Sequence, residues 1–591
     1  MTDATTVRHR HSQHTTATIF YQVAMPQPQS HLFEITLQVD NWQESVLDLK
    51  MPVWTPGSYL IREYARHIQD FRSNNSDTQE PLESKKISKN HWQINTNNCS
   101  KITVKYRVFA NELTVRTNHL DGTHGYFNGA ALFFFIPKYK QQSIKVEIVP
   151  PKSDWIVSTP LKAIDTQKYI FEAKDFDTLV DSPVEVGKQK IYNFQVLGKP
   201  HQYAIWGEGN AKTEKLIKDT AKIIEYEAQL FDGLPYEKYL FLLHLSGSGY
   251  GGLEHKDSCT LNYPRFGFRD REKYNRFLQL VAHEFFHLWN VKRIRPKALE
   301  TFDYEAENYT TSLWFCEGTT SYYDILIPLK AGIYKRKTFL ENISKDITRY
   351  LTTPGRNVQP LGESSYDAWI KLYRRDANSD NNQISYYLKG ELVSLLLDLL
   401  IRAKHENKKS LDDVMRLMWQ RFGIDEIGFS EMQLRQAIAE VADVNLDEFF
   451  HRYIETTTEL PFNEYLEPFG LHLKPVKEKE KVPYVGIKIQ SENGKEVIKF
   501  VAVDSPASTA GIDPGDELLA IDGVRVTAES FNKRLQDYQV GESIRVSIFH
   551  QDELKNLSLT LTQPQPSRYE IEIQENLSAT QKQNLSGWLG Q

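Results

Sequence analysis

The middle of the chain carries the stretch His283-Glu284-Phe285-Phe286-His287-Leu288-Trp289. It closes a helix predicted over residues 271–289, in which apolar residues recur at three- and four-residue spacing. Histidines at positions i and i+4 share one helix face, so His283 and His287 can reach one metal ion, with Glu284 beside it. The alternative is a pair of half-exposed helical histidines that bind nothing.

A third candidate ligand favours the metal site. Glu317 stands in Trp314-Phe315-Cys316-Glu317-Gly318, a second helical stretch 30 positions after His287. Two histidines and one glutamate leave a fourth zinc position open for water, which is typical of a catalytic site holding one zinc ion per chain. The neighbouring Cys316 points about 100° away on a helix, so we expect it to pack rather than to bind.

A zinc-bound water that attacks a carbonyl needs a general base, and Glu284 is the candidate. Two further segments carry other groups that such hydrolysis needs. Tyr387, in Ser385-Tyr386-Tyr387-Leu388-Lys389-Gly390, is a candidate hydrogen-bond donor to an oxyanion. In Gly251-Gly252-Leu253-Glu254-His255 the glycines permit close backbone approach, and Glu254 is suited to hold a substrate's α-ammonium group. Read alone, these segments are a helical core tyrosine and a turn.

Composition excludes several classes of protein. The 591 residues carry 71 basic and 77 acidic side chains, a net charge of −6, which does not favour nucleic acid or anionic membrane as a partner. Three cysteines, too few and too far apart for a disulfide framework, fit a reducing compartment. We predict no membrane span and no secretory signal, and therefore a cytoplasmic protein.

The hydrophobic period divides the chain into regions. Residues 17–190 alternate apolar and polar side chains, which predicts an all-β domain after a disordered tail at 1–16. Helical spacing with a few short strands follows over 191–330, and helices, including a long apolar one at 385–403, dominate 331–475. A charged linker at 477–481 precedes a β-rich module at 482–563 and a C-terminal tail at 564–591, in which Trp588 and Leu589 are suited to dock a last helix.

Taken together, these motifs resemble the glycyl aminopeptidase family of gluzincin zinc metallopeptidases. The resemblance rests on Gly251 to His255, on the His283 stretch extended to Arg293, on Glu317-Gly318-Thr319-Thr320-Ser321-Tyr322-Tyr323, and on His124-Gly125-Tyr126-Phe127-Asn128-Gly129. It implies a multidomain α+β protein with a saddle-like N-terminal β-domain, a thermolysin-like catalytic domain and a helical domain. It also implies that His283, His287 and Glu317 bind zinc, that Glu284 is the base, and that Gly or Ala is removed from peptide N-termini.

The segment around residue 254 is similar to the Gly-Ala-Met-Glu-Asn motif of larger aminopeptidases, with His255 in place of the Asn. This similarity implies that Gly251, Gly252 and Glu254 bind the substrate amine. The segment from Tyr387 to Gly390 is similar to the Tyr-x-Lys-Gly of the same enzymes, which implies that Tyr387 is the oxyanion donor.

The C-terminal module resembles a PDZ domain in Ser505-Pro506-Ala507-Ser508-Thr509-Ala510-Gly511-Ile512 and Pro514-Gly515-Asp516-Glu517-Leu518. The resemblance makes Tyr484-Val485-Gly486-Ile487 a carboxylate-binding loop for protein C-termini, unless the groove is covered. Three hypotheses follow. The protein is a zinc aminopeptidase with a PDZ module, a zinc endopeptidase whose PDZ module tethers its substrates, or a non-catalytic peptide-binding adaptor.

Overall fold

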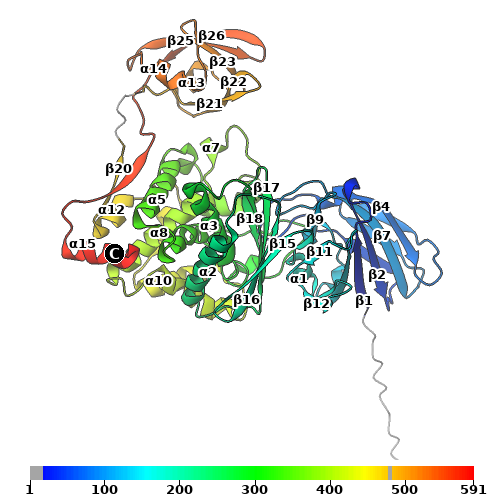
Figure 1. The fold of residues 1–591 in the computed structure, drawn as a ribbon. Coiled ribbons are helices and arrows are strands. Elements are labelled where there is room, and N and C mark those ends of the chain that lie inside the picture. The colour runs from blue at the N-terminus through cyan, green and yellow to red at the C-terminus, as the bar shows by residue number, and fades with distance from the viewer. Residues whose placement is uncertain (1–16, 477–481, 591) are drawn as a thin grey trace, which may run out of the picture.

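The computed structural model describes residues 17–476 and 482–590. A β-rich N-terminal region lies beside a mixed central region, and a small C-terminal module lies above the central region (Figure 1). Each of the three has its own cluster of buried apolar side chains. The predicted tail at 1–16 and the predicted linker at 477–481 lie outside the described residues, and the predicted domain boundaries stay predictions.

The N-terminal region contains three sheets, as the alternating pattern predicts. The order of the largest is β12-β13-β10-β1-β2-β7-β4, and the smaller two are β11-β14-β9-β8 and β3-β6-β5. Their strands are β1 (Thr18–Ala24), β2 (Leu32–Asp40), β3 (Val46–Lys50), β4 (Ile68–Asn75), β5 (Ser84–Ser88), β6 (His91–Asn95), β7 (Lys101–Phe109), β8 (His119–Leu120), β9 (His124–Phe127), β10 (Ile144–Val149), β11 (Ile156–Ser158), β12 (Lys162–Asp165), β13 (Ile170–Ala173) and β14 (Val184–Gly187). Helix α1 (Phe176–Val180) connects the last two strands.

The central region is built on a five-stranded sheet in the order β15-β16-β17-β19-β18. Its strands are β15 (Lys190–Val196), β16 (Lys199–Trp206), β17 (Tyr239–Ser246), β18 (Gly251–Glu254) and β19 (Ser258–Pro264). β16, β17 and β19 run parallel, whereas β18 returns antiparallel along β19 as the edge strand. This edge strand carries the glycine-rich segment singled out in the sequence, and it lies beside helix α3 (Arg271–Phe286).

The remaining helices of the body form the largest buried apolar cluster together with α3 and the sheet. They are α2 (Thr213–Leu230), α4 (Thr320–Lys330), α5 (Arg336–Leu351), α6 (Leu361–Tyr366), α7 (Ser379–Asn382), α8 (Tyr386–Lys404), α9 (Leu411–Met418), α10 (Glu431–Ala442), α11 (Asp447–Phe450) and α12 (Phe462–Leu466). π-helical turns occur at Trp314–Thr319, Trp419–Gly423 and His451–Glu455. No helix of the described ranges is long and apolar enough to cross a bilayer.

The C-terminal module has the strand order β21-β22-β23-β25-β26, with β24 paired to β23. Its elements are β21 (Ile487–Glu492), β22 (Lys495–Val501), α13 (Pro506–Ala510), β23 (Glu517–Ile521), β24 (Val524–Arg525), α14 (Phe531–Leu535), β25 (Ser543–His550) and β26 (Glu553–Thr560).

The chain returns to the body after the module. Strand β27 (Tyr569–Ile573) pairs with β20 (Leu471–Pro475), and α15 (Ala579–Leu589) buries Trp588 completely. The docking of a last helix is therefore as expected, but the region expected to be wholly helical ends in strand β20. The partner of β20 is β27, which follows the C-terminal module in the sequence, so no local pattern predicts this pairing.

Candidate active site

Helix α3 presents the two histidines. Its N-cap is Asp270, whose side chain accepts a hydrogen bond from the Lys273 backbone amide at 2.9 Å. The helix ends at Phe286, and His287 continues in helical backbone conformation. The His283 and His287 rings therefore lie one turn apart, with centroids separated by 4.6 Å and planes nearly perpendicular.

Glu317 reaches the same point from the π-helical turn Trp314–Thr319. Its Oε2 lies 3.1 Å from His287 Nε2 and 3.5 Å from His283 Nε2. One ligand atom from each of the three residues lies within 4.8 Å of the others. Residues that are 30 positions apart in the sequence thus form a two-His, one-Glu donor set.

Each histidine is oriented through its other ring nitrogen. His283 Nδ1 donates to Asp324 Oδ2 at 2.9 Å, and His287 Nδ1 donates to the Asn290 carbonyl at 2.7 Å. Both hydrogen bonds leave Nε2 facing Glu317, which is the arrangement that outer-shell partners impose on zinc-binding imidazoles. The side-chain amide of Asn290 donates to the carbonyls of Phe315 and Cys316. It therefore links the end of α3 to the turn that carries Glu317.

The donor set fits a zinc ion. Two imidazole nitrogens and one carboxylate are the ligands of open catalytic zinc sites. Burial acts to raise the pKa of Glu317, but the two adjacent histidines lower it to about 2, so the carboxylate is ionised as a ligand must be. The Cys316 thiol is buried beside this set but is not part of it.

Glu284 lies against the edge strand of the sheet. Burial raises the pKa of this carboxyl to about 7, and its Oε2 has no hydrogen-bond partner among the described residues. A Cβ atom placed on Gly252 of β18 would stand 2.1 Å from Glu284 Oε1. Only glycine at position 252 therefore permits this close approach of strand and base.

Glu254 closes the same strand. It is 3% exposed, and among the described residues its Oε1 has no partner. A Cβ on Gly57 would meet that oxygen at 2.5 Å, so a turn of the N-terminal region covers the carboxylate with bare backbone. Gly252 thus lies against Glu284, and Glu254 on the same strand has one oxygen available to accept a hydrogen bond from a cation. At Gly251, by contrast, the nearest atom to a Cβ would be Arg116 Nη1 at 3.9 Å.

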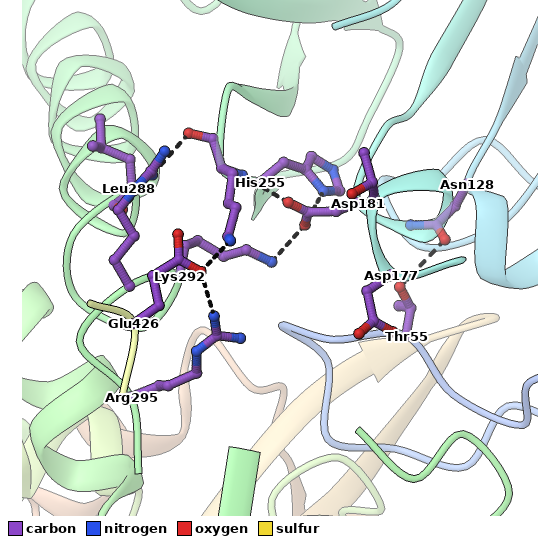
Figure 2. Close-up of polar contacts among 12 residues, drawn as sticks. Thr55, Asn128, Asp177, Asp181, His255, Leu288, Lys292, Arg295 and Glu426 are labelled. Atoms are coloured by element: carbon purple, nitrogen blue, oxygen red, sulfur yellow. Dashed lines mark hydrogen bonds and ion pairs between the residues drawn. The ribbon is translucent and has the colours of Figure 1, made fainter. Parts of the chain in front are cut away.

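A polar junction anchors the chain beyond Glu254 (Figure 2). His255 lies 3.2 Å from Asp181 Oδ1 through its Nδ1. Lys292 donates to the same oxygen at 2.5 Å, and Glu426 pairs with Lys256 and Arg295. These contacts join the N-terminal region, the loop after β18 and the loop after α3.

Tyr387 enters from the first turn of α8. Its ring centroid lies 6.2 Å from that of His283, and its hydroxyl lies 3.2 Å from the hydroxyl of Tyr373. Removal from water and the charge of Glu317 raise the pKa of Tyr387 well above its usual value, so the phenol keeps its proton. Tyr387 therefore stands beside the candidate ligands as a neutral donor.

Several residues of this site were not anticipated from the sequence. Asp324 and Asn290 orient the histidines, and Tyr373 contacts Tyr387. Arg116 comes from the N-terminal region, and its Nη2 donates to the Gly252 carbonyl at 3.3 Å. None of them belongs to a spaced motif, although Asn290 directly follows the histidine stretch.

The predicted carboxylate loop, Tyr484 to Ile487, leads into strand β21 of the C-terminal module. Tyr484 donates its amide to Thr562, and the Gly486 carbonyl accepts from Ala502. Among the described residues, the backbone amides of Val485 and Gly486 have no hydrogen-bond acceptor. Two free N–H groups thus stand at the start of edge strand β21.

Comparisons with known families match three parts of the chain. A model described as the Peptidase M61 N-terminal domain matches residues 20–188, and one described as M61 glycyl aminopeptidase matches residues 276–393. A PDZ domain model matches residues 483–561. Among curated proteins, no significant match was found.

Among solved structures, an aminopeptidase N family protein from Idiomarina loihiensis is 30% identical, with a TM-score of 0.91, and the match covers 97% of this chain and 100% of that one. An M1 zinc metallopeptidase from Deinococcus radiodurans is 12% identical over 75% of this chain and 94% of that one, with a TM-score of 0.46. Yeast LTA4 hydrolase is 13% identical over 76% and 69%, with a TM-score of 0.44.

Proposed function

Because this chain belongs to the M61 glycyl aminopeptidase family of zinc metallopeptidases, we propose that it removes a small N-terminal residue, Gly or Ala, from peptides. His283, His287 and Glu317 hold one zinc ion in this proposal, and Glu284 is the general base. The observation that carries it is that these three donors converge beside Glu284, whose buried Oε2 has no hydrogen-bond partner among the described residues.

A zinc ion bound there supplies Lewis acidity toward the scissile carbonyl and toward water. Glu284 accepts the proton of the attacking water on Oε2 and delivers it to the leaving amine. A carboxyl group whose pKa burial has raised to about 7 can both accept and release a proton near neutral pH. Tyr387 donates its phenolic hydrogen to the oxyanion without adding charge.

Glu254 binds the substrate's α-ammonium group in this proposal. A buried carboxylate without a partner is costly unless a cation pairs with it, and the substrate amine is such a cation.

The test uses small peptides. We expect the protein to release Gly or Ala from an unblocked peptide and to leave the acetylated twin intact. Glu284→Gln should abolish turnover while the zinc bound by His283, His287 and Glu317 is retained. Equal cleavage of both peptides would establish the endopeptidase alternative. Zinc binding without any hydrolysis would favour the adaptor.

A second function, capture of peptide C-termini by the PDZ module, is supported by the unused amides of Val485 and Gly486. A peptide carboxylate can accept from both, while its backbone extends edge strand β21. A fluorescent peptide with a free C-terminus should bind, and its C-terminal amide should bind at least tenfold more weakly. Equal affinity for the two would refute this function.

A further inference from the structure

A second group of potential metal ligands lies in the N-terminal region, at the turn between β8 and β9. His119, Asp121 and His124 each offer one ligand atom, and these atoms lie within 4.8 Å of one another. His119 Nε2 is 3.3 Å from Asp121 Oδ2, and the rings of His119 and His124 have centroids 4.9 Å apart. None of these residues belongs to the proposed active site.

The orientation of His124 is set by a buried carboxylate. Glu185 of β14 accepts a hydrogen bond from His124 Nδ1 at 2.7 Å, and its other oxygen accepts from His244 Nε2 at 2.9 Å. A carboxylate, histidine and metal in series is the usual way in which an outer-shell group prepares an imidazole ligand.

The nitrogen that this leaves available is unused. His124 is fully buried, and among the described residues its Nε2 has no hydrogen-bond partner. Trp206 stacks on the ring at a centroid distance of 3.7 Å, which holds it in place. With Nδ1 protonated toward Glu185, Nε2 presents a lone pair on the ring beside His119, and a buried lone pair without a partner costs free energy of folding.

We propose that His119, Asp121 and His124 bind a second divalent metal ion of the zinc class, with Glu185 as the residue that positions His124. Two imidazoles and one carboxylate suit zinc better than calcium or magnesium, which prefer oxygen ligands. The Asp121 side chain is 32% exposed, which leaves access for water as a further ligand.

The site lies where two parts of the molecule meet. Glu185 belongs to the sheet of β8, β9 and β14, whereas His244 belongs to β17 of the central sheet. Nearby, the Tyr126 hydroxyl donates to Thr260 Oγ1 at 3.1 Å across the same boundary. A bound ion therefore fixes His124, which contacts the central sheet through Trp206 and, by way of Glu185, through His244.

Metal stoichiometry tests the proposal. After saturation with zinc and removal of free ions, the full-length protein should hold two equivalents by elemental analysis. His287→Gln and His119→Gln should each hold one, and the double variant none. As a matched control, His91→Gln removes a histidine paired with Asp48 at 2.8 Å but without a third donor, and should leave two. If His119→Gln does not lower the zinc content of the His287→Gln protein, the proposal is wrong.

A second measurement covers a variant that folds poorly. Asp121→Asn keeps Oδ1, which accepts from the amides of Thr123 and His124 and so preserves the turn, but replaces the Oδ2 ligand. In the His287→Gln background, bound cobalt should give visible d–d absorption that Asp121→Asn abolishes. Undiminished absorption in this variant would overturn the assignment.

Discussion

Asp324 forms a hydrogen bond with His283, one of the candidate zinc ligands. It holds the Nδ1 proton of His283 at 2.9 Å. Because outer-shell partners of this kind are worth about 10–100-fold in metal affinity, Asp324→Ala should weaken zinc binding by that factor in competition with a chelator. Asp177→Ala, which removes a carboxylate bonded to Tyr304, is the control and should leave the affinity unchanged. Equal affinities for both variants would contradict this role of Asp324.

The space beside Gly252 is occupied by the Glu284 side chain. A methyl group at position 252 would stand 2.1 Å from Glu284 Oε1 and would push the base aside. A displacement of about 1 Å costs about 100-fold in rate, so Gly252→Ala should lower kcat by at least that factor while zinc content is retained. Gly122→Ala, whose Cβ would meet no atom within 4 Å, should have wild-type kcat. An active Gly252→Ala enzyme would show that β18 can move away.

At the residue level, geometry could be predicted from the sequence where the pattern is local. His283 and His287 could be paired because helical spacing alone puts them on one face. Arg116 could not be predicted, because it is 136 positions from the carbonyl that it contacts. Asp324 was equally hidden, since nothing in its own segment marks it as the partner of His283.

At the scale of elements, the π-helical turn at Trp314–Thr319 and helix α8 cross at two glycines. A Cβ on Gly318 would lie 2.5 Å from the Cα of Gly390. This contact sets the approach of the element that carries Glu317 to the one that carries Tyr387. Side chains at either position would separate the two elements.

Gly318→Ala should therefore lower the free energy of unfolding by about 1–3 kcal/mol, because the added methyl meets backbone that cannot rotate away. Thermal unfolding measures the loss. Gly362→Ala, also in a helix but with its nearest contact at 3.6 Å, should be neutral or slightly stabilising. If the two variants unfold at the same temperature, the two elements can move apart at Gly318 and Gly390 without loss of stability.

Asp181 joins the N-terminal region to the catalytic region. Burial acts to raise its pKa, but Lys292 and His255 hold that pKa well below the usual 3.8. A depressed carboxyl pKa stabilises the fold above pH 3.8 and loses that contribution as pH falls toward the folded-state value. Asp181→Asn leaves Lys292 buried without its counter-ion and should cost about 3 kcal/mol.

Urea unfolding at several pH values checks this prediction. The difference between wild type and Asp181→Asn should be constant from pH 7 to pH 5 and should shrink below pH 3.8. Asp154→Asn, which breaks an exposed pair with Lys188, should show a small difference throughout. If wild type and Asp181→Asn differ in free energy of unfolding by the same amount at pH 3 and pH 7, this ion pair is not the cause of the difference.

For the molecule as a whole, the placement of the PDZ module depends on helix α7. Asn381 donates to the Val501 carbonyl at 2.9 Å and accepts from the Val503 amide at 3.1 Å, while Asp380 pairs with Lys488 at 3.0 Å. Helix α7 lies just before α8 in the sequence and beneath the module in Figure 1, so the module contacts the segment that leads into the helix carrying Tyr387.

Asn381→Ala removes two hydrogen bonds, worth about 2 kcal/mol together, and should release the module. Small-angle scattering should then show a larger radius of gyration. Lys495→Ala breaks a pair with Glu517 inside the module and should leave the scattering unchanged. Identical curves for wild type and Asn381→Ala would mean that other contacts hold the module.

The sequence by itself determined the periods of the strands and helices and the pairing of His283 with His287, because these depend on repeat geometry within short stretches. The tertiary structure decided which groups surround the ligands: Gly252 against Glu284, Arg116 beside β18, and Asp324 behind His283. It alone brought Glu185 and His244 to His124. Contacts of this kind join residues far apart in the chain, and packing of whole sheets and helices creates them.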